Sequence, residues 1–183
     1  MEYARPFALT SSSRLETYID FGNNLHSTAN KIQFNKLQAI KAIEKDTANL
    51  RPGLKLIYAE EALATLDGHS PGNIKKETVS PTIAIPGFAR EDNFYLQFTG
   101  YLYASQPGMY TLKLASDDGS RLWLHDSLAI ENDGLHSALE KTARVYLMRG
   151  HHPVKIEYFE GSYGQALYFD VQNQQGHKLG LCH

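Results

Sequence analysis

From residue 94 onward, apolar and polar side chains alternate along the chain in short runs. In the first run, Phe94, Leu96, Phe98 and Leu102 fall on one side, and tyrosine, glutamine and threonine residues fall on the other. A period of two is typical of a strand that buries only one face. The run therefore predicts a long, half-buried strand.

Further alternating runs follow and predict the remaining strands. They lie at residues 110–114, 121–125, 128–130, 143–147, 154–158 and 167–171. Turn residues separate the runs, and no segment of helical length intervenes, which indicates an antiparallel sandwich or barrel rather than a parallel α/β sheet. We interpret the strands on either side of Gln106-Pro107-Gly108 as a hairpin. The fold class that we predict is all-β, an antiparallel β-sandwich.

The N-terminal segment does not follow this pattern. Between Asn23 and Pro52 there is no glycine. The apolar residues at 34, 37, 40 and 43 approximate helical spacing, yet Ile32 and Phe34 also fit a strand. Both alternatives stay open. Arg51-Pro52-Gly53 is the best boundary because proline disfavours helix in the preceding residue. We predict an N-terminal segment or linker at 1–51, the end of a preceding domain, and a β-sandwich at 52–183.

Composition narrows the class of protein. The 183 residues are 42% hydrophobic and 21% charged, with a formal net charge of -2, which is typical of one soluble, folded core. Lys and Arg are scattered, so the basic stripe of a nucleic-acid-binding protein is missing. No run approaches the roughly 20 apolar residues of a membrane span. Nucleic acid and a membrane span are therefore not expected.

The cellular compartment is not readable from cysteine. Cys182 is the single cysteine, so no internal disulfide can form. The N-terminus lacks the basic and apolar regions of a signal peptide. If the parent protein is exported, we expect this chain to be an internal piece of it.

Several motifs occur in a recognisable order. They are Pro52-Gly53-Leu54, Phe98-Thr99-Gly100-Tyr101-Leu102, Gly108-Met109-Tyr110-Thr111, Ser116-Asp117-Asp118-Gly119-Ser120-Arg121-Leu122-Trp123-Leu124, Asn132-Asp133-Gly134 and Glu157-Tyr158-Phe159-Glu160. From Pro52 to about Val171, the chain resembles the protective-antigen-type β-sandwich family, the PA-fourteen domain of bacterial toxins, yeast adhesins and many glycosidases. The resemblance implies a jelly-roll-like, lectin-like sandwich from an exported parent, with an extracellular, periplasmic or cell-surface location.

The chain departs from the family pattern in places. Leu124-His125-Asp126-Ser127 stands where many members have Ile-Asp-Gly, so we expect an altered turn. Residues before Arg51 look like the closing strand of a preceding domain, such as the small β module beside the catalytic barrel in some bacterial β-hexosaminidases.

The candidate binding residues lie in two loops. Sugars need fixed carboxylates for hydroxyl pairs and aromatic surface for ring faces. In a trans strand, Asp117 and Asp118 would face opposite sides, but a cis peptide bond, as the resemblance implies, would turn both toward one ligand. Calcium would relieve their repulsion, and the loop at 160–164 would add ligands. The expected metal ligands are Asp117, Asp118 and Glu160, and these three with Tyr163 and Trp123 are the expected carbohydrate-binding residues.

Blander readings stand beside these roles. Asp-Asp-Gly-Ser can simply close a hairpin, and Trp123, which alternates with Leu122 and Leu124, can instead be buried or partly buried on the second face of the sandwich. The adhesins tend to carry an asparagine in the later loop, where this chain has Glu160. Asn132-Asp133-Gly134 is expected to be a loop with positive backbone angles, and His136 a surface or packing residue. His151 and His152 should face opposite sides, with a turn before Pro153.

No enzyme motif survives inspection. Gly68-His69-Ser70-Pro71-Gly72 fits Gly-x-Ser-x-Gly, but Pro71 lacks the N–H that the oxyanion hole needs. Asp117 and Asp118 are adjacent, and a glycosidase needs two carboxylates across a cleft. We therefore expect a noncatalytic, calcium-assisted carbohydrate-binding module whose partners are a glycan and adjacent domains of the parent. The alternatives are a structural module that shapes the substrate entrance of a neighbouring catalytic domain and, less favoured, a hydrolase.

Overall fold

The computed structural model describes residues 5–44, 49–173, 176 and 179–183. It divides into two compact units, Met1–Gln38 and Ala39–His183. Every regular element in the described residues is a β-strand, which confirms the all-β prediction. No helix in this part of the chain is long and apolar enough to span a membrane.

The N-terminal unit is built on a two-stranded antiparallel sheet. β1 (Ser13–Thr17) pairs with β2 (Asn30–Phe34), and Leu15 lies opposite Ile32. Of the two alternatives for this segment, helix or strand, the strand is therefore the one observed at Ile32 and Phe34. The other face of the ribbon is charged, since Arg14 and Lys31 both pair with Glu16. The ribbon thus has one apolar face and one charged face.

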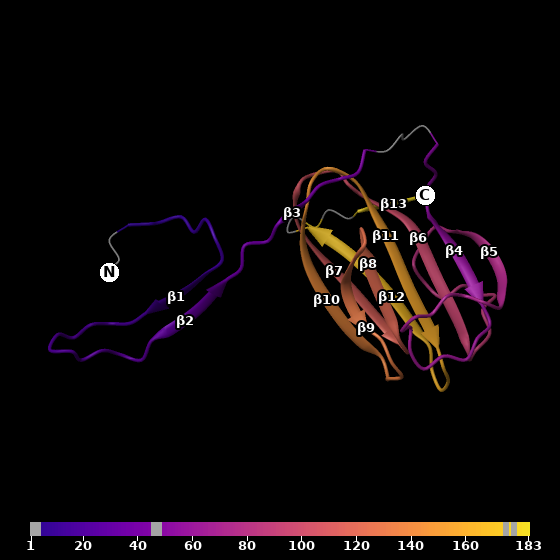
Figure 1. Cartoon of the computed structure of the whole chain (residues 1–183), viewed down its shortest axis with the longest axis horizontal. Coiled ribbons are helices and arrows are strands. Elements are labelled where there is room, and N and C mark those ends of the chain that lie inside the picture. The colour runs from indigo at the N-terminus through magenta and orange to yellow at the C-terminus, as the bar shows by residue number, and fades with distance from the viewer. Residues whose placement is uncertain (1–4, 45–48, 174–175, 177–178) are drawn as a thin grey trace. The chain divides into compact units, whose positions relative to one another are not determined.

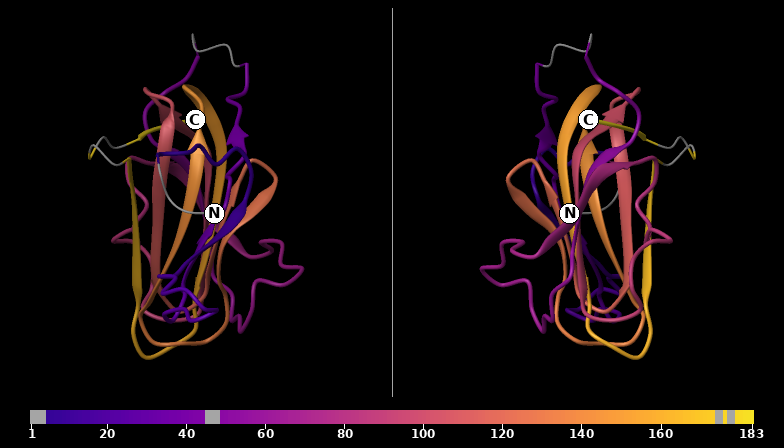
Figure 2. Two further views of the ribbon diagram at one scale, coloured as in Figure 1. Left: turned by 90° about the vertical axis from the view of Figure 1, so that its left-hand side faces the viewer. Right: turned by 90° about the vertical axis from the view of Figure 1, so that its right-hand side faces the viewer.

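The second unit is a sandwich of two sheets, seen from two sides in Figure 2. The four-stranded sheet has the order β12 (Ala166–Asn173), β7 (Gly108–Asp117), β10 (Leu139–Leu147) and β3 (Ala39–Ile40). The seven-stranded sheet has the order β5 (Ile74–Ser80), β4 (Leu54–Ala59), β6 (Phe94–Ala104), β11 (Gly150–Glu160), β8 (Ser120–Leu124) and β9 (Ser127–Asn132), with β13 (Gly180–Cys182) also on β6. The pairs are antiparallel except β3 with β10 (Figure 1).

The strands bury alternate side chains between the two sheets. Leu112 and Leu114 of β7 and Phe98, Leu122 and Ile156 of the opposite sheet are fully buried. Their positions follow the alternation in the sequence, because side chains on one strand point to opposite faces in turn. The core therefore lies where the pattern predicted it.

The predicted hairpin at Gln106-Pro107-Gly108 is wrong. β6 pairs with β4, β11 and β13, whereas β7 pairs with β10 and β12. The turn therefore carries the chain from one sheet to the other, as does Asp117-Asp118-Gly119 between β7 and β8. The buried faces of such consecutive strands stack on each other across the core, which excludes hydrogen bonding between them.

A small second core covers part of the outer face of the seven-stranded sheet. Ala59, Leu66, Tyr95 and Phe159 are buried together there, beside Leu63 of the β4–β5 loop. This explains why Tyr95 is fully buried although it lies on the polar side of the alternating pattern. The loop covers the sheet at this end.

Residues just before the predicted boundary belong with the sandwich. β3 pairs with β10, and Arg51 exchanges two backbone hydrogen bonds with His183. The division into compact units thus falls at Gln38, earlier than Arg51. A boundary at Arg51 stays a prediction of where the family domain begins.

Candidate functional site

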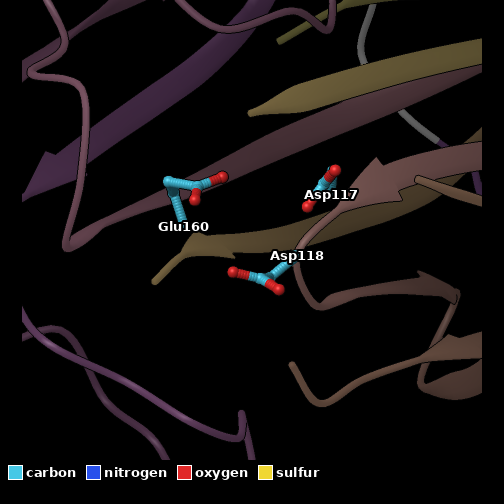
Figure 3. Close-up of side chains that lie close together, drawn as sticks. All are labelled: Asp117, Asp118 and Glu160. Carbon is cyan, nitrogen blue, oxygen red and sulfur yellow. The ribbon is translucent and has the colours of Figure 1, made fainter. Parts of the chain in front are cut away.

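Three acidic side chains meet at one end of the sandwich. Asp117 ends β7 in the four-stranded sheet, Asp118 follows it, and Glu160 ends β11 in the seven-stranded sheet. One carboxylate oxygen of each lies within 4.8 Å of the others. Figure 3 shows the three groups around a common space. The peptide bond between Asp117 and Asp118 is cis, and the turn joins opposite sheets rather than closing a hairpin.

Asp118 is held by backbone donors from two loops. Its Oδ1 accepts a hydrogen bond from the His136 N–H at 2.8 Å, and its Oδ2 accepts one from the Gly161 N–H at 3.0 Å. The side chain is buried, so these bonds compensate part of its lost hydration. Asp118 therefore ties the β9–β10 and β11–β12 loops to the carboxylate cluster.

Tyr158 links the two sheets beneath the cluster. Its hydroxyl lies 2.6 Å from the carbonyl oxygen of Asp117 and 2.8 Å from Oε2 of Glu160. Burial raises the pKa of Tyr158 well above its usual value, and the hydrogen bond to Glu160 adds to that rise. The hydroxyl therefore stays protonated and orients both residues.

Glu160 is the least satisfied member of the cluster. It is fully buried, and among the described residues its Oε1 has no hydrogen-bond partner. The pKa of Glu160 is raised to about 7: burial raises it most, the Tyr158 hydrogen bond lowers it, and the negative charges of Asp118 and Asp117 raise it. A buried, unpaired carboxylate oxygen is costly, and a bound cation would satisfy it.

The chemistry of these donors fits a hard divalent cation. Calcium takes six to eight oxygen ligands from carboxylates, carbonyls and water. Three carboxylates supply part of that shell and more than balance the charge of one ion. The side chains thus fit calcium, with coordination positions left for water or sugar hydroxyls.

Two exposed apolar side chains belong to the loops beside the cluster. Tyr163 is fully exposed, with a φ of 76°, in the β11–β12 loop. In that loop, a Cβ on Gly161 would meet Asp118 Oδ2 at 3.0 Å and Leu135 Cδ2 at 2.9 Å. Leu135, in the β9–β10 loop, is 61% exposed. Glycine is needed at 161 for this close approach, which places Leu135 next to the cluster.

A salt-bridged carboxylate fixes the neighbouring loops. Asp133 accepts hydrogen bonds from Thr65 Oγ1 at 2.7 Å and from the Leu66 N–H, and it pairs with Arg121 at 3.0 Å. The next residue, Gly134, has a φ of 101°, as expected of this loop. Asp133 therefore holds the β4–β5 loop against the start of the β9–β10 loop, whose His136 N–H binds Asp118.

The structure does not bring Trp123 to the carboxylate cluster. Trp123 is the fourth residue of β8, so roughly 10 Å of extended strand, at 3.3 Å per residue, separates it from the first residue of β8 after the turn that carries Asp118. Its half-buried ring is on the outer face of the seven-stranded sheet, where its indole N–H donates to Glu157 Oε2 at 2.8 Å. Trp123 is therefore partly buried on the second face of the sheet, as the alternative predicted.

The two adjacent histidines face opposite sides of the sheet, as expected. His152 is fully buried and His151 is half-buried on the outer face, against Tyr103. The predicted turn before Pro153 is wrong, because 150–160 form the continuous strand β11. The Gly68–Gly72 segment lies in the β4–β5 loop without a strand-to-helix turn, which agrees with its rejection as a nucleophile elbow.

Sequence reasoning missed three contributors to the site. Tyr158 reads as an ordinary core residue of β11, and His136 acts through its backbone N–H, which no side-chain pattern reveals. Leu135 offered a signal, since it is an apolar residue among turn residues. Asp117, Asp118 and Glu160 were the expected metal ligands, and their convergence is observed, whereas metal binding stays a prediction.

Together, the fold and site define a β-sandwich with a carboxylate cluster between the ends of its two sheets. The sequence profile of the PA14 domain matches residues 50–179. The chain therefore belongs to the PA14 domain family, which confirms the resemblance seen in the sequence. No curated protein sequence matches it.

Solved structures share the fold at low sequence identity. The A domain of Epithelial Adhesin 9 from Candida glabrata, subtype-switched and in complex with β-lactose, is 11% identical, with a TM-score of 0.63 over 81% of this chain and 95% of that one. A PA14 sugar-binding domain from an RTX adhesin is 18% identical, with a TM-score of 0.57 over 72% and 95%. An anti-sigma factor domain-containing protein is 21% identical, with a TM-score of 0.60. The match covers 70% of this chain and 45% of that protein's chain, so this chain spans less than half of its length.

Proposed function

We propose that this chain is a noncatalytic carbohydrate-binding module that binds glycan through calcium held by Asp117, Asp118 and Glu160. The observation that carries the proposal is the convergence of these carboxylates within 4.8 Å around a buried oxygen of Glu160 that has no partner among the described residues. Calcium would neutralise the cluster and offer open positions to a pair of sugar hydroxyls. Tyr163 and Leu135 would then contact the apolar face of the sugar ring.

The parent that we propose is an exported glycosidase or a surface protein, with the module outside the cytoplasm. Support comes from the fold neighbours, which include adhesins, one of them solved with β-lactose and another described as a sugar-binding domain. Glycan and the adjacent domains of the parent are the partners in this proposal.

Calcium titration by calorimetry tests the metal site. We expect one binding event that Glu160→Gln weakens at least tenfold, because the substitution removes one charge with little change in shape. Glu140→Gln on β10, an exposed position, is the matched control and should leave binding unchanged. No heat in the unaltered protein, or equal affinity in both variants, would contradict the proposal.

Glycan-array binding, with calcium and then with a chelator, tests the sugar site. The expected result is a set of glycans bound only with calcium and lost in Glu160→Gln. Calcium binding with an empty array would leave a metal site without a lectin function.

A second candidate function is packing on a neighbouring domain. The N-terminal unit favours it because its large apolar side chains are exposed at Phe7, Leu9, Tyr18, Ile19, Phe21, Leu25, Ile32, Phe34 and Leu37. A two-stranded ribbon is marginally stable alone, and such a surface is typical of an interface. Limited proteolysis should cut residues 5–38 in the isolated chain and spare them in the parent protein. Equal cleavage in both would reject this candidate.

A further inference from the structure

A pocket of about 360 Å³ lies on the outer face of the seven-stranded sheet, and none of its lining residues belongs to the carboxylate cluster. Its lining comes from β8, the β8–β9 turn and the neighbouring part of β11, namely Trp123, His125, Asp126, Pro153, Val154 and Lys155. The volume is at the lower end of the roughly 300–1,000 Å³ range of small-ligand sites. The register explains the grouping, since Trp123 lies opposite Lys155 and Leu124 opposite Val154.

The indole ring in this pocket is fixed in place. Its N–H donates to Glu157, and the Lys155 ammonium lies 5.1 Å from the ring centroid. Lys155 also pairs with Glu157 at 3.0 Å, which uses one of its three donor hydrogens. Glu157 further accepts the Tyr95 hydroxyl at 3.1 Å. A buried carboxylate thus orients both the aromatic ring and the ammonium, as in a preorganised binding site.

Two hydrogen-bonded histidines, His125 and His152, determine which ring nitrogen of His125 can accept a hydrogen bond. His125 is the one that lines the pocket. His152 Nε2 lies 2.8 Å from the Met148 carbonyl, so it carries the proton and Nδ1 is an acceptor. His125 Nε2 lies 3.1 Å from that Nδ1 and must donate to it. Burial lowers the pKa of His125, so the ring is neutral near pH 7 and its own Nδ1 is an acceptor.

The groups of the pocket match a neutral sugar ring. Lys155 is paired with Glu157 and His125 is neutral, so Asp126 at the exposed turn is the remaining charge in the lining, which disfavours an anionic ligand. Hydroxyls both donate and accept, and Asp126, His125 and Lys155 offer both kinds of partner. The indole and the Pro153 ring supply apolar faces against which the C–H groups of a pyranose can pack.

We propose that this pocket is a second carbohydrate site, which binds a neutral hexopyranose unit without a metal ion. It is independent of the calcium site, because its lining shares no residue with the carboxylate cluster and roughly 10 Å of β8 separates Trp123 from the start of the strand. The two sites would engage separate parts of one branched or extended glycan.

Trp123 is the single tryptophan of the chain, so fluorescence excited at the red edge, where the tyrosines absorb little, reports on this pocket. The probes are methyl β-D-glucopyranoside, methyl β-D-galactopyranoside and methyl α-D-mannopyranoside, each titrated to high millimolar concentration in a chelator. We expect a saturable change with at least one probe. Glu160→Gln should leave it unchanged, and Asp126→Ala, at an exposed position, should weaken it at least fivefold.

Each other outcome overturns the proposal. No saturable change with any probe removes the site. A change that requires calcium or is lost in Glu160→Gln assigns the sugar to the carboxylate cluster, and one that survives Asp126→Ala and Lys155→Met assigns it elsewhere. Failure of calcium binding alone leaves this result intact, so the two sites fail separately.

Discussion

The carboxylate cluster and the Trp123 pocket differ in whether their buried carboxylates have hydrogen-bond and ion-pair partners. In the cluster, Asp117, Asp118 and Glu160 meet, and among the described residues Glu160 Oε1 has no hydrogen-bond partner. In the pocket, the buried carboxylate of Glu157 is matched by Lys155, the indole N–H and the Tyr95 hydroxyl. The first arrangement leaves a buried carboxylate oxygen without a partner among the described residues, whereas the second is complete within the protein.

The position of each site in the sandwich accounts for this difference. The cluster lies where loops join two sheets, and its members come from different layers. The pocket lies within one sheet, where cross-strand neighbours can be matched pair by pair. Strand ends from opposite sheets can therefore bring several carboxylates together without matching cations. An outer sheet face can instead hold an aromatic side chain in a fixed orientation through cross-strand partners.

Gly119→Ala should have the largest effect on the cluster. A Cβ at this position would lie 2.3 Å from Cε1 of the buried Phe159 ring, so the turn after Asp118 must shift. Overpacking of this kind costs about 1–3 kcal/mol in the free energy of unfolding. Urea denaturation measures it, and calcium affinity should fall as well. Gly87→Ala, where a Cβ meets no atom within 4 Å, is the control, and an equal loss there would reject the explanation.

Removing one phenolic hydroxyl in each region gives a matched comparison. Tyr158→Phe and Tyr95→Phe each leave a buried carboxylate with one donor fewer, so each should cost about 1–3 kcal/mol. Only Tyr158→Phe should also weaken calcium binding, by severalfold, because Tyr158 orients Glu160. Thermal denaturation and calcium calorimetry on both variants check this. Equal calcium affinity in the two would break the distinction between the regions.

The two hydrogen-bonded histidines beside the pocket should make stability depend on pH. Burial lowers the pKa of His152 and of His125, and the two neighbouring histidines lower that of His152 further. Above about pH 6.5, both rings are neutral in the folded and unfolded states. As the pH falls below that value, the unfolded chain takes up protons that the folded chain refuses, so the free energy of unfolding decreases.

Urea denaturation near pH 7.5 and near pH 5 measures this effect. The double variant His125→Gln/His152→Gln should show a smaller loss of stability on acidification than the unaltered protein. The difference between the two proteins isolates the histidines from the carboxyl groups, which titrate in both. Parallel pH curves for the two proteins would contradict the prediction, because they would show that folding does not change proton uptake by His125 and His152.

The smallest effect on stability is expected at the exposed rim of the cluster. Tyr163→Ala and Leu135→Ser remove side chains that are largely in solvent, so the free energy of unfolding should change by less than about 0.5 kcal/mol. Calcium affinity should also hold. Glycan binding should fall severalfold, because the apolar contact with the sugar is lost. Unchanged glycan-array signals would exclude these side chains from the site.

Much of the fold could be predicted from alternation alone. The strands around Phe98, Leu112, Leu122 and Ile156 were expected, because a period of two fixes which side chains of a strand face the core. The placement of Asp117 and Asp118 at a strand end was equally readable, since a polar turn interrupts the apolar pattern there. Local sequence carries this information because neighbouring residues determine it.

Tertiary structure decided which strands became neighbours and therefore which distant residues meet. The two strands around Gln106-Pro107-Gly108 lie in different sheets instead of pairing, and alternation cannot distinguish these arrangements because each strand buries one apolar face in both. Glu160 is more than forty residues from Asp117 and approaches it only because β7 and β11 end at the same end of the sandwich. Trp123, five residues from Asp118, is carried away from it by the length of β8. Strand direction is a local property, whereas contact between strands depends on how whole sheets pack.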